Sequence, residues 1–79
     1  MKNKETVEIY GCQYAVCGQA SSGQMQQIAG YVDRKMRELA SNNPCLDTAR
    51  LAMLSAVNIA DDYLRLQADY QELEELVNA

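Results

Sequence analysis

Few side chains in this sequence have the types and spacing that chemistry needs. Cysteines stand at positions 12, 17 and 45, and the 79 residues contain no histidine. No two cysteines have the C-x-x-C spacing of a zinc or redox site, and an odd number is typical of free thiols in a reducing compartment. Cys12 and Cys17 would lie at opposite ends of one strand, too far apart for an undistorted disulfide. We therefore expect no metal site.

Two shorter motifs resemble reactive sites. Asp61 and Asp62 resemble a carboxylate pair for acid–base work or magnesium, but adjacent helical residues point about 100° apart, so we expect a solvated face. Ser21-Ser22-Gly23 offers N–H groups to an anion at a helix start, although the same residues make an ordinary N-cap. The four glycines stand alone and form no phosphate loop. We expect no catalytic residues, no cofactor and no enzyme activity.

The strongest pattern lies in the last third of the chain. Apolar residues recur there at alternating gaps of four and three, which is the repeat of a coiled-coil seam. A helix over residues 48–78 would be roughly 45 Å long, whereas a compact domain of this size has a radius of gyration of about 12 Å. The helix must project, and its seam requires a partner chain. The expected oligomer interface is Ala52, Ala56, Ile59, Tyr63, Leu66, Tyr70, Leu73 and Val77.

The N-terminal residues predict a β-hairpin. Thr6–Tyr10 and Gln13–Cys17 alternate as strands do, and glycine at the first central position of Gly11-Cys12 suits a type II′ turn. That register pairs Ile9 with Tyr14 and Val7 with Val16, so that these four residues share one face. A lone hairpin is not stable in water, so this face must pack on a helix or extend another sheet.

A first helix is predicted from about Ser22 to about Ser41. Ser21 and Gln24 have the spacing of a capping box, and Asn42-Asn43-Pro44 ends the helix because asparagine tolerates the left-handed conformation and proline cannot continue it. The residues of its apolar face recur with helical spacing: Met25, Ile28, Ala29, Val32, Met36, Leu39 and Ala40.

The second helix begins after Asp47, which can cap its free N–H groups. A second apolar stripe runs beside the seam and consists of Met53, Val57, Ala60 and Leu64. A helix with two apolar sides is buried on two sides, so residues 49–64 should lie between the head and a partner chain. Asn58 lies in this region, either bonded to the hairpin or a loop or exposed at the edge of the seam.

These elements predict an α+β fold of order β-β-α-α, in which an N-terminal hairpin and one amphipathic helix precede a long C-terminal helix that forms an intermolecular coiled coil. Residues 1–46 form the head. Residues 47–79 form the long helix, whose first half packs on the head and whose second half is a coiled-coil tail. The seam-flanking positions carry no basic residue, so charge selects neither parallel nor antiparallel pairing.

Charge and hydropathy exclude several classes of protein. The net charge is −4, and residues 61–79 carry Arg65 against six acidic groups, so the tail repels nucleic acid and anionic membranes. No apolar run approaches 18 residues, and the N-terminus lacks the apolar stretch of a secretory signal. We expect a cytosolic protein with neither a nucleic acid nor a membrane as partner.

Four segments, in order, resemble the ZapA family of bacterial cell-division proteins: residues 6–11, 31–40, 46–52 and 56–61. The resemblance implies a β-β-α-α head with a C-terminal coiled coil, and a homodimer or a dimer of dimers. It also implies a non-enzymatic protein of the cytoplasm, located at the division septum. Such a protein binds, cross-links and aligns filaments of FtsZ, the tubulin-like GTPase of the division ring.

Some family members contact the filament through basic residues just after the first-strand glycine. Here Cys12 and Ala15 occupy those positions, so we carry over no hairpin contact. The exposed basic candidates for binding acidic FtsZ are Arg34, Arg37 and Arg50. Without the resemblance, the residues favour equally a coiled-coil dimerisation or scaffold module of another cytosolic assembly. A DNA-binding regulator is disfavoured because neither helix is a basic recognition helix.

Overall fold

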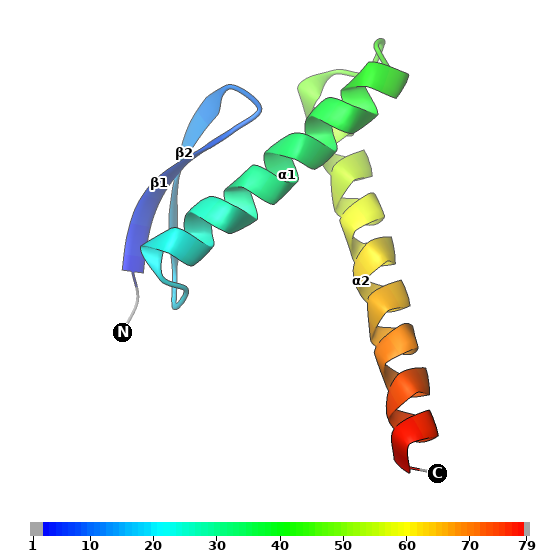
Figure 1. Ribbon diagram of the computed structural model, residues 1–79. Coiled ribbons are helices and arrows are strands. Elements are labelled where there is room, and N and C mark those ends of the chain that lie inside the picture. The colour runs from blue at the N-terminus through cyan, green and yellow to red at the C-terminus, as the bar shows by residue number, and fades with distance from the viewer. Residues whose placement is uncertain (1–2, 79) are drawn as a thin grey trace.

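The computed structural model describes residues 3–78. Strand β1 (Asn3–Ile9) and strand β2 (Cys12–Gly18) are followed by helix α1 (Ser22–Asn42) and helix α2 (Thr48–Asn78). The hairpin lies beside α1, and α2 leaves the far end of α1 and runs away from the head as a rod (Figure 1). The radius of gyration is 15.8 Å, so the predicted β-β-α-α order and the projecting helix are both confirmed.

The hairpin turn differs from the prediction. Ile9 pairs with Cys12 and Val7 with Tyr14, so the type II′ turn at Gly11-Cys12 is wrong and the register is shifted by two residues. The central residues are instead Tyr10 and Gly11, with φ values of 52° and 79°, and two positive φ values are the mark of a type I′ turn. Because a shift of two preserves the alternation of side chains, the apolar face is still the one predicted.

Helix α1 begins as its sequence predicts. The Gln24 N–H donates to Ser21 Oγ at 3.2 Å, and the Ser21 N–H donates to Gln24 Oε1 at 2.9 Å, which completes the capping box. Its end differs, because Asn43 has a φ of −137° and is not left-handed. The Asn43 side-chain amide instead donates to the Leu39 carbonyl at 2.9 Å and satisfies one of the free carbonyls of the last turn.

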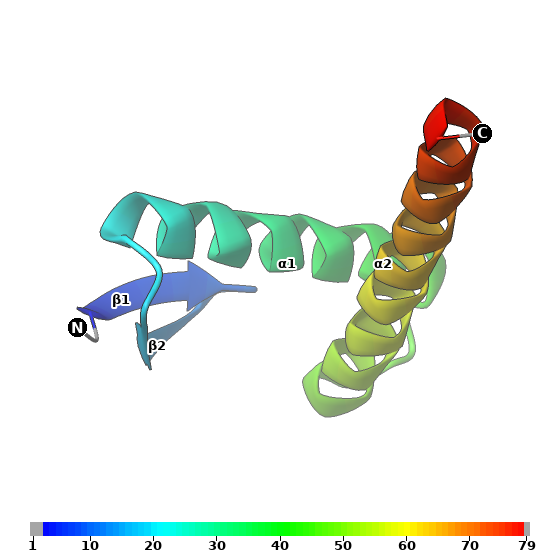
Figure 2. The same ribbon diagram turned by 90° about the horizontal axis from the view of Figure 1, so that it is seen from below.

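The head has a small core where the hairpin meets α1. Val7, Met25 and Ala29 are buried together, and Ile9, Val16 and Ala20 pack partly buried against them. Figure 2 shows the hairpin covering one face of α1 and α2 crossing α1 near its other end. Met36 and Leu51 are buried as well, on α1 and α2. The apolar face predicted for the first helix is therefore covered in part, since Ile28 remains 59% exposed.

Helix α2 is covered on one narrow side. The Arg50 N–H donates to Asp47 Oδ1 at 2.8 Å, so Asp47 caps the helix as predicted. Leu51 and Ser55 are buried, and Ser55 Oγ donates to the Leu51 carbonyl at 2.7 Å. From Tyr63 to Asn78 every residue is exposed. Within residues 3–78, no helix has the length and apolar character needed to cross a membrane.

The covered side of α2 is more polar than the sequence suggested. Leu51, Ser55, Asn58 and Asp62 recur at intervals of three and four and are buried or half-buried, which places them on the side toward α1. Asn58 is thus half-buried on that side, and no hydrogen bond of its amide is found within the described residues. Both apolar stripes of α2 point elsewhere.

Candidate functional site

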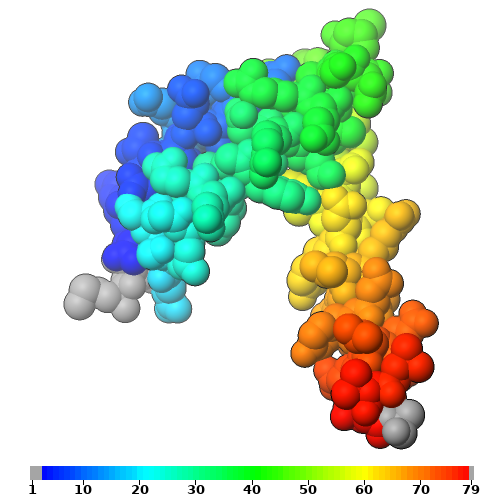
Figure 3. All heavy atoms as spheres, in the orientation of Figure 1, coloured from blue at the N-terminus to red at the C-terminus, as the bar shows by residue number. Residues whose placement is uncertain are grey.

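The predicted interface residues form a continuous exposed surface along α2, here called the seam. Seven of the eight are exposed and Ile59 is half-buried. The exposed fractions of Tyr63, Leu66 and Tyr70 are 61, 68 and 65%. In Figure 3 the distal part of the rod stands clear of the head. A continuous apolar surface of this length is typical of a protein–protein contact.

The second apolar stripe is equally uncovered. Met53, Val57 and Leu64 are 71, 66 and 58% exposed, and Ala60 is exposed too. A helix turns about 100° per residue, so the stripe lies on the far side of the seam from Leu51 and Ser55. Moving around α2, the contact with α1 comes first, then the seam, then the stripe. The chain itself covers the first of these three surfaces.

An apolar groove opens between the inner face of the hairpin and the two helices. It has a volume of about 390 Å³. Its lining consists of Ile9, Tyr10, Tyr14, Ala15, Val16, Val32, Met36, Thr48 and Ala52. Ala52 is also the first residue of the seam, so the seam and the groove form one connected apolar surface. We call this space the seam groove.

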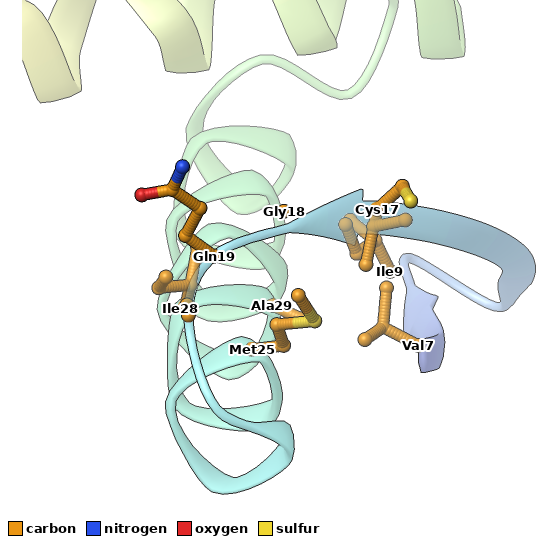
Figure 4. Close-up of a pocket in the computed structure, with 10 residues that line it drawn as sticks. Val7, Ile9, Cys17, Gly18, Gln19, Met25, Ile28 and Ala29 are labelled. Carbon is orange, nitrogen blue, oxygen red and sulfur yellow. The ribbon is translucent and has the colours of Figure 1, made fainter. Parts of the chain in front are cut away.

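A smaller cavity of about 230 Å³ lies at the other end of the hairpin. Figure 4 shows Val7 and Ile9 from the hairpin facing Met25 and Ala29 of α1, while the Gln19 side chain points away from them. Its lining is the edge of the core already described, so this cavity marks where the hairpin covers α1 incompletely.

A polar cluster fixes the hairpin turn to α1. The Tyr10 N–H donates to Asp33 Oδ1 at 2.7 Å, and Arg37 Nε donates to Asp33 Oδ2 at 2.9 Å. The Arg37 guanidinium also lies 5.6 Å from the centroid of the Tyr10 ring. The Arg37 hydrogen bond, followed by the Tyr10 N–H, lowers the pKa of the Asp33 carboxyl below its usual value. We call Tyr10, Asp33 and Arg37 the turn lock.

A second polar cluster joins the two helices. Lys35 Nζ lies 2.9 Å from Asp62 Oδ2, and the Tyr31 hydroxyl donates to the same oxygen at 3.5 Å. The Lys35 hydrogen bond lowers the pKa of Asp62, and Asp62 in turn raises the pKa of Lys35. The sequence predicted a solvated face for Asp61 and Asp62. Asp62 differs from that prediction, because it pairs with Lys35 of α1. Its neighbour Asp61 faces away and pairs with Arg65 at 3.2 Å.

The three basic candidates have different surroundings. Arg34 and Arg50 are exposed, on α1 and in the first turn of α2. Arg37 is 58% exposed at its side chain and is committed to Asp33. Arg34 and Arg37 lie one turn apart on α1, whereas Arg50 lies after the loop that connects α1 to α2. Within the described residues, no contact joins the three side chains. Asp33 with Arg37 was detectable as an i, i+4 pair, but the Lys35–Asp62 pair has no local signal.

The remaining chemistry-bearing residues do not assemble. Cys12, Cys17 and Cys45 are all exposed free thiols. Over residues 3–78, no three cysteine, aspartate or glutamate side chains come together as a metal site would require. The apolar seam, the stripe and the seam groove are therefore the surfaces of this chain that point to a function.

Known proteins resemble this chain along almost its whole length. The family model described as "Cell division protein ZapA" matches residues 6–79. ZapA of Bacillus anthracis is 49% identical over 74 residues, covering 94% of this chain and 83% of the relative. ZapA of Bacillus pumilus is 49% identical over 73 residues, covering 92% and 86%.

A solved structure agrees with the same assignment. It is a ZapA mutant dimer from Geobacillus stearothermophilus, which is 39% identical to this chain with a TM-score of 0.78. The likeness covers 100% of this chain and 92% of that one, so it includes the head and the rod. On sequence and fold together, this chain belongs to the ZapA family of cell division proteins.

Proposed function

We propose that this protein forms a homodimer through the α2 seam and uses its heads to bind, cross-link and align FtsZ filaments at the division septum, in the cytoplasm. The observation that carries the proposal is the uncovered seam on a rod that projects from the head. One chain has one head and cannot bridge two filaments. Pairing through the seam supplies a second head.

The strength of such a bridge would come from repetition. A filament offers the same binding surface at every subunit, so many weak head contacts add up to a strong attachment through high local concentration. Neither head needs a reactive group for this role. The dimerisation in the related Geobacillus protein supports the first step, and the family's part in cell division supports the choice of partner.

We assign the filament contact to the exposed basic residues of the head. Arg34 and Arg50 are exposed, and the chain as a whole is acidic, so these side chains are a local attraction for an acidic filament. Arg37 is a weaker candidate, because Asp33 already neutralises its charge at 2.9 Å. Contacts of this kind weaken as salt concentration rises.

The first test combines light scattering with filament pelleting. The full-length chain is expected to have at least twice the monomer mass at micromolar concentration, to sediment with FtsZ filaments and to thicken them into bundles seen by electron microscopy. A dimer that does not sediment with filaments would favour the scaffold module of another assembly. A folded monomer would remove the bridging role.

The second test concerns the basic residues. Arg34→Glu with Arg50→Glu is expected to abolish bundling while leaving mass and helix content unchanged. Arg65→Glu, on the exposed rod, makes the same kind of charge reversal away from the head and serves as the control. Bundling that survives the double reversal would exclude both arginines. Arg37 is left out because its substitution would also break the turn lock.

A further inference from the structure

We propose that Tyr31, Lys35 and Asp62 hold helices α1 and α2 at a fixed angle, and that this angle sets how far apart the two heads of a dimer hold the filaments they bridge. We call the crossing of the two helices the elbow, and we call these three side chains the elbow clasp. The claim about filament spacing rests on the function proposed above, whereas the claim about the angle does not.

The packing of α2 on its own chain restrains the elbow weakly. Within residues 3–78, the buried residues of α2 are Leu51 and Ser55. The Ser55 hydroxyl donates to the Leu51 carbonyl of its own helix, so this hydrogen bond does not join α2 to α1. The seam groove of about 390 Å³ opens between the hairpin and the first turns of α2, so the hairpin does not brace the helix on that side.

A small change at the elbow is large at the end of the rod. The crossing angles of packed helices scatter by about 15–20° around their preferred values. Glu72 lies about 25 Å along α2 from Ser55 at the helical rise per residue, so a swing of about 20° would move it by about 9 Å. A defined relation between head and rod therefore needs a contact placed beyond the point where the helices cross.

The elbow clasp supplies a contact at that place. Figure 2 shows α2 continuing past its crossing with α1, and Asp62 lies about two turns beyond Ser55. Lys35 Nζ lies 2.9 Å from Asp62 Oδ2, and the Tyr31 hydroxyl donates to the same oxygen at 3.5 Å. Since Tyr31 and Lys35 lie one turn apart on α1, the carboxylate is held from two positions along that helix. Two such contacts resist a swing of α2 that one contact would allow.

The lysine of the clasp is itself held in place. Its side chain is 18% exposed, although lysine side chains usually extend into water. Its ammonium also lies 5.9 Å from the centroid of the Tyr31 ring, within reach of a cation–π interaction. The neighbouring Asp61–Arg65 pair differs, because its side chains are 56 and 76% exposed and both belong to α2. The Lys35–Asp62 pair is therefore built as a geometric restraint between two helices.

The angle matters for a protein that joins filaments. Each head of a dimer is connected to its rod by one elbow, so the distance and direction between the two heads depend on the angle of both elbows. A fixed angle gives every crossbridge the same length and so aligns the filaments. A loose angle would still collect filaments, but at irregular distances. The clasp residues are positioning residues in this sense, since they act on the filament through the head.

The test measures the elbow with two spin labels in the full-length dimer. The three native cysteines are replaced by serine, and labels are attached at Gln27→Cys on α1 and Glu72→Cys on the rod, both at exposed positions. An excess of the unlabelled cysteine-free chain leaves one labelled chain in each dimer, so double electron–electron resonance reports the distance within that chain. We expect a single narrow distribution of distances.

Charge reversal and its rescue then test the clasp. Lys35→Asp places two carboxylates opposite each other, and we expect it to broaden the distance distribution by up to about 9 Å, the displacement that a swing of about 20° produces. Adding Asp62→Lys to the same chain restores opposite charges and is expected to restore the narrow distribution. The matched control is Arg65→Asp, which makes the same charge change in a pair within α2 and should leave the distribution unchanged.

A clasp that only stabilised the fold would give a different result. Lys35→Asp would then lower Tm while the folded protein kept its narrow distribution, and that outcome would overturn the inference. A broad distribution in the chain with an intact clasp would overturn it as well. Lys35→Met and Tyr31→Phe keep most of each side chain and remove one polar contact each, so they decide the question in the same way if charge reversal prevents folding.

The claim about filament spacing has its own readout. Lys35→Met is expected to pellet as much FtsZ as the wild type, but electron micrographs of its bundles should show a wider range of distances between filaments. Uniform spacing despite a loosened elbow would overturn the claim about spacing. A wild-type protein that does not bundle filaments would refute the proposed function, and the spin-label distances would still decide whether the clasp fixes the elbow.

Discussion

The head and the rod use the same kinds of residue in opposite ways. In the head and the part of α2 that contacts it, Val7, Met25 and Leu51 are buried, and the two polar clusters fix the turn and the helix crossing. In the rod, Leu66 and Val77 are 68 and 75% exposed. The head therefore derives its structure from contacts within one chain, whereas residues 63–78 of the rod are all exposed and make their proposed contacts with a second chain. Four substitutions test how far this division holds.

The largest effect is expected from Leu51→Ala. Leu51 is 1% exposed, and truncation of a buried leucine to alanine costs about 2–5 kcal/mol through lost burial and the cavity that remains. Urea denaturation followed by circular dichroism measures the loss. Leu76→Ala is the matched control on the rod, 71% exposed and outside the seam, and should change the free energy of unfolding by less than about 0.5 kcal/mol. Equal losses in the free energy of unfolding for Leu51→Ala and Leu76→Ala would contradict the distinction between buried and exposed parts of the chain.

The next effect belongs to the rod. Leu66→Asp places a charge in the seam, where dimerisation would bury it without a partner, so we expect the dimer to weaken by about 3 kcal/mol, or roughly a hundredfold in Kd. Sedimentation equilibrium over a range of concentrations measures the shift. Ala68→Asp adds the same charge on the opposite side of α2 and should leave Kd nearly unchanged. A dimer indifferent to both substitutions would mean that the seam is not the interface.

A smaller effect is expected at the hairpin turn. Gly11 has a φ of 79°, and a Cβ there meets no atom within 4 Å, so Gly11→Ala tests the backbone conformation alone. The left-handed region costs an L-residue roughly 1–2 kcal/mol, which is the expected loss in the free energy of unfolding. Gly30→Ala also meets nothing within 4 Å, but it lies inside α1 and should stabilise by about 0.5–1 kcal/mol. Thermal unfolding should show a lower Tm for Gly11→Ala and a higher Tm for Gly30→Ala.

The smallest effect concerns the contact between the helices. Because Lys35 lowers the pKa of Asp62, the ion pair stabilises the fold above the ordinary carboxyl pKa of 3.8, and this contribution is lost as pH falls. Because Asp62 raises the pKa of Lys35, the contribution is present below 10.5 and is lost as pH rises beyond it. Asp62→Asn should therefore lower Tm most near neutral pH. The difference in Tm between the wild type and Asp62→Asn should become smaller as pH is lowered below 4. A difference that stays constant would show that the charge of Asp62 does not contribute to stability.

Local sequence signals located the elements well. The capping box at Ser21, the cap at Asp47 and the apolar alternation of the hairpin each depend on residues within four positions of one another, and each is present in the structure. The exposed seam was equally detectable, since a heptad pattern needs no knowledge of what packs where. These features give the order of elements and the face that each presents.

Features that depend on distant residues were predicted less well. The turn became type I′ with Tyr10 in a left-handed conformation, and the partner of its N–H is Asp33, 23 positions away. The side of α2 that meets α1 carries Ser55 and Asp62 beside Leu51, because the Leu51 carbonyl accepts from Ser55 and because Lys35 and Tyr31 of α1 contact Asp62. Neither the Tyr10–Asp33 contact nor the Lys35–Asp62 contact produces a periodic pattern in the sequence. The groove, built from three elements, could not be seen from any one of them.

The polar back of α2 has a consequence for the size of the assembly. Asp61, Arg65, Glu72 and Glu75 are exposed on the side opposite the seam, so beyond Leu64, where the second stripe ends, the seam is the continuous apolar surface of the rod. In a two-fold pair both chains contribute the same surface, the seam, and pairing buries the seam of both chains. Growth then terminates at a closed particle of fixed valency, whereas a head-to-tail contact would polymerise without limit. A cross-linker built this way adds crossbridges to an existing polymer without becoming a polymer itself.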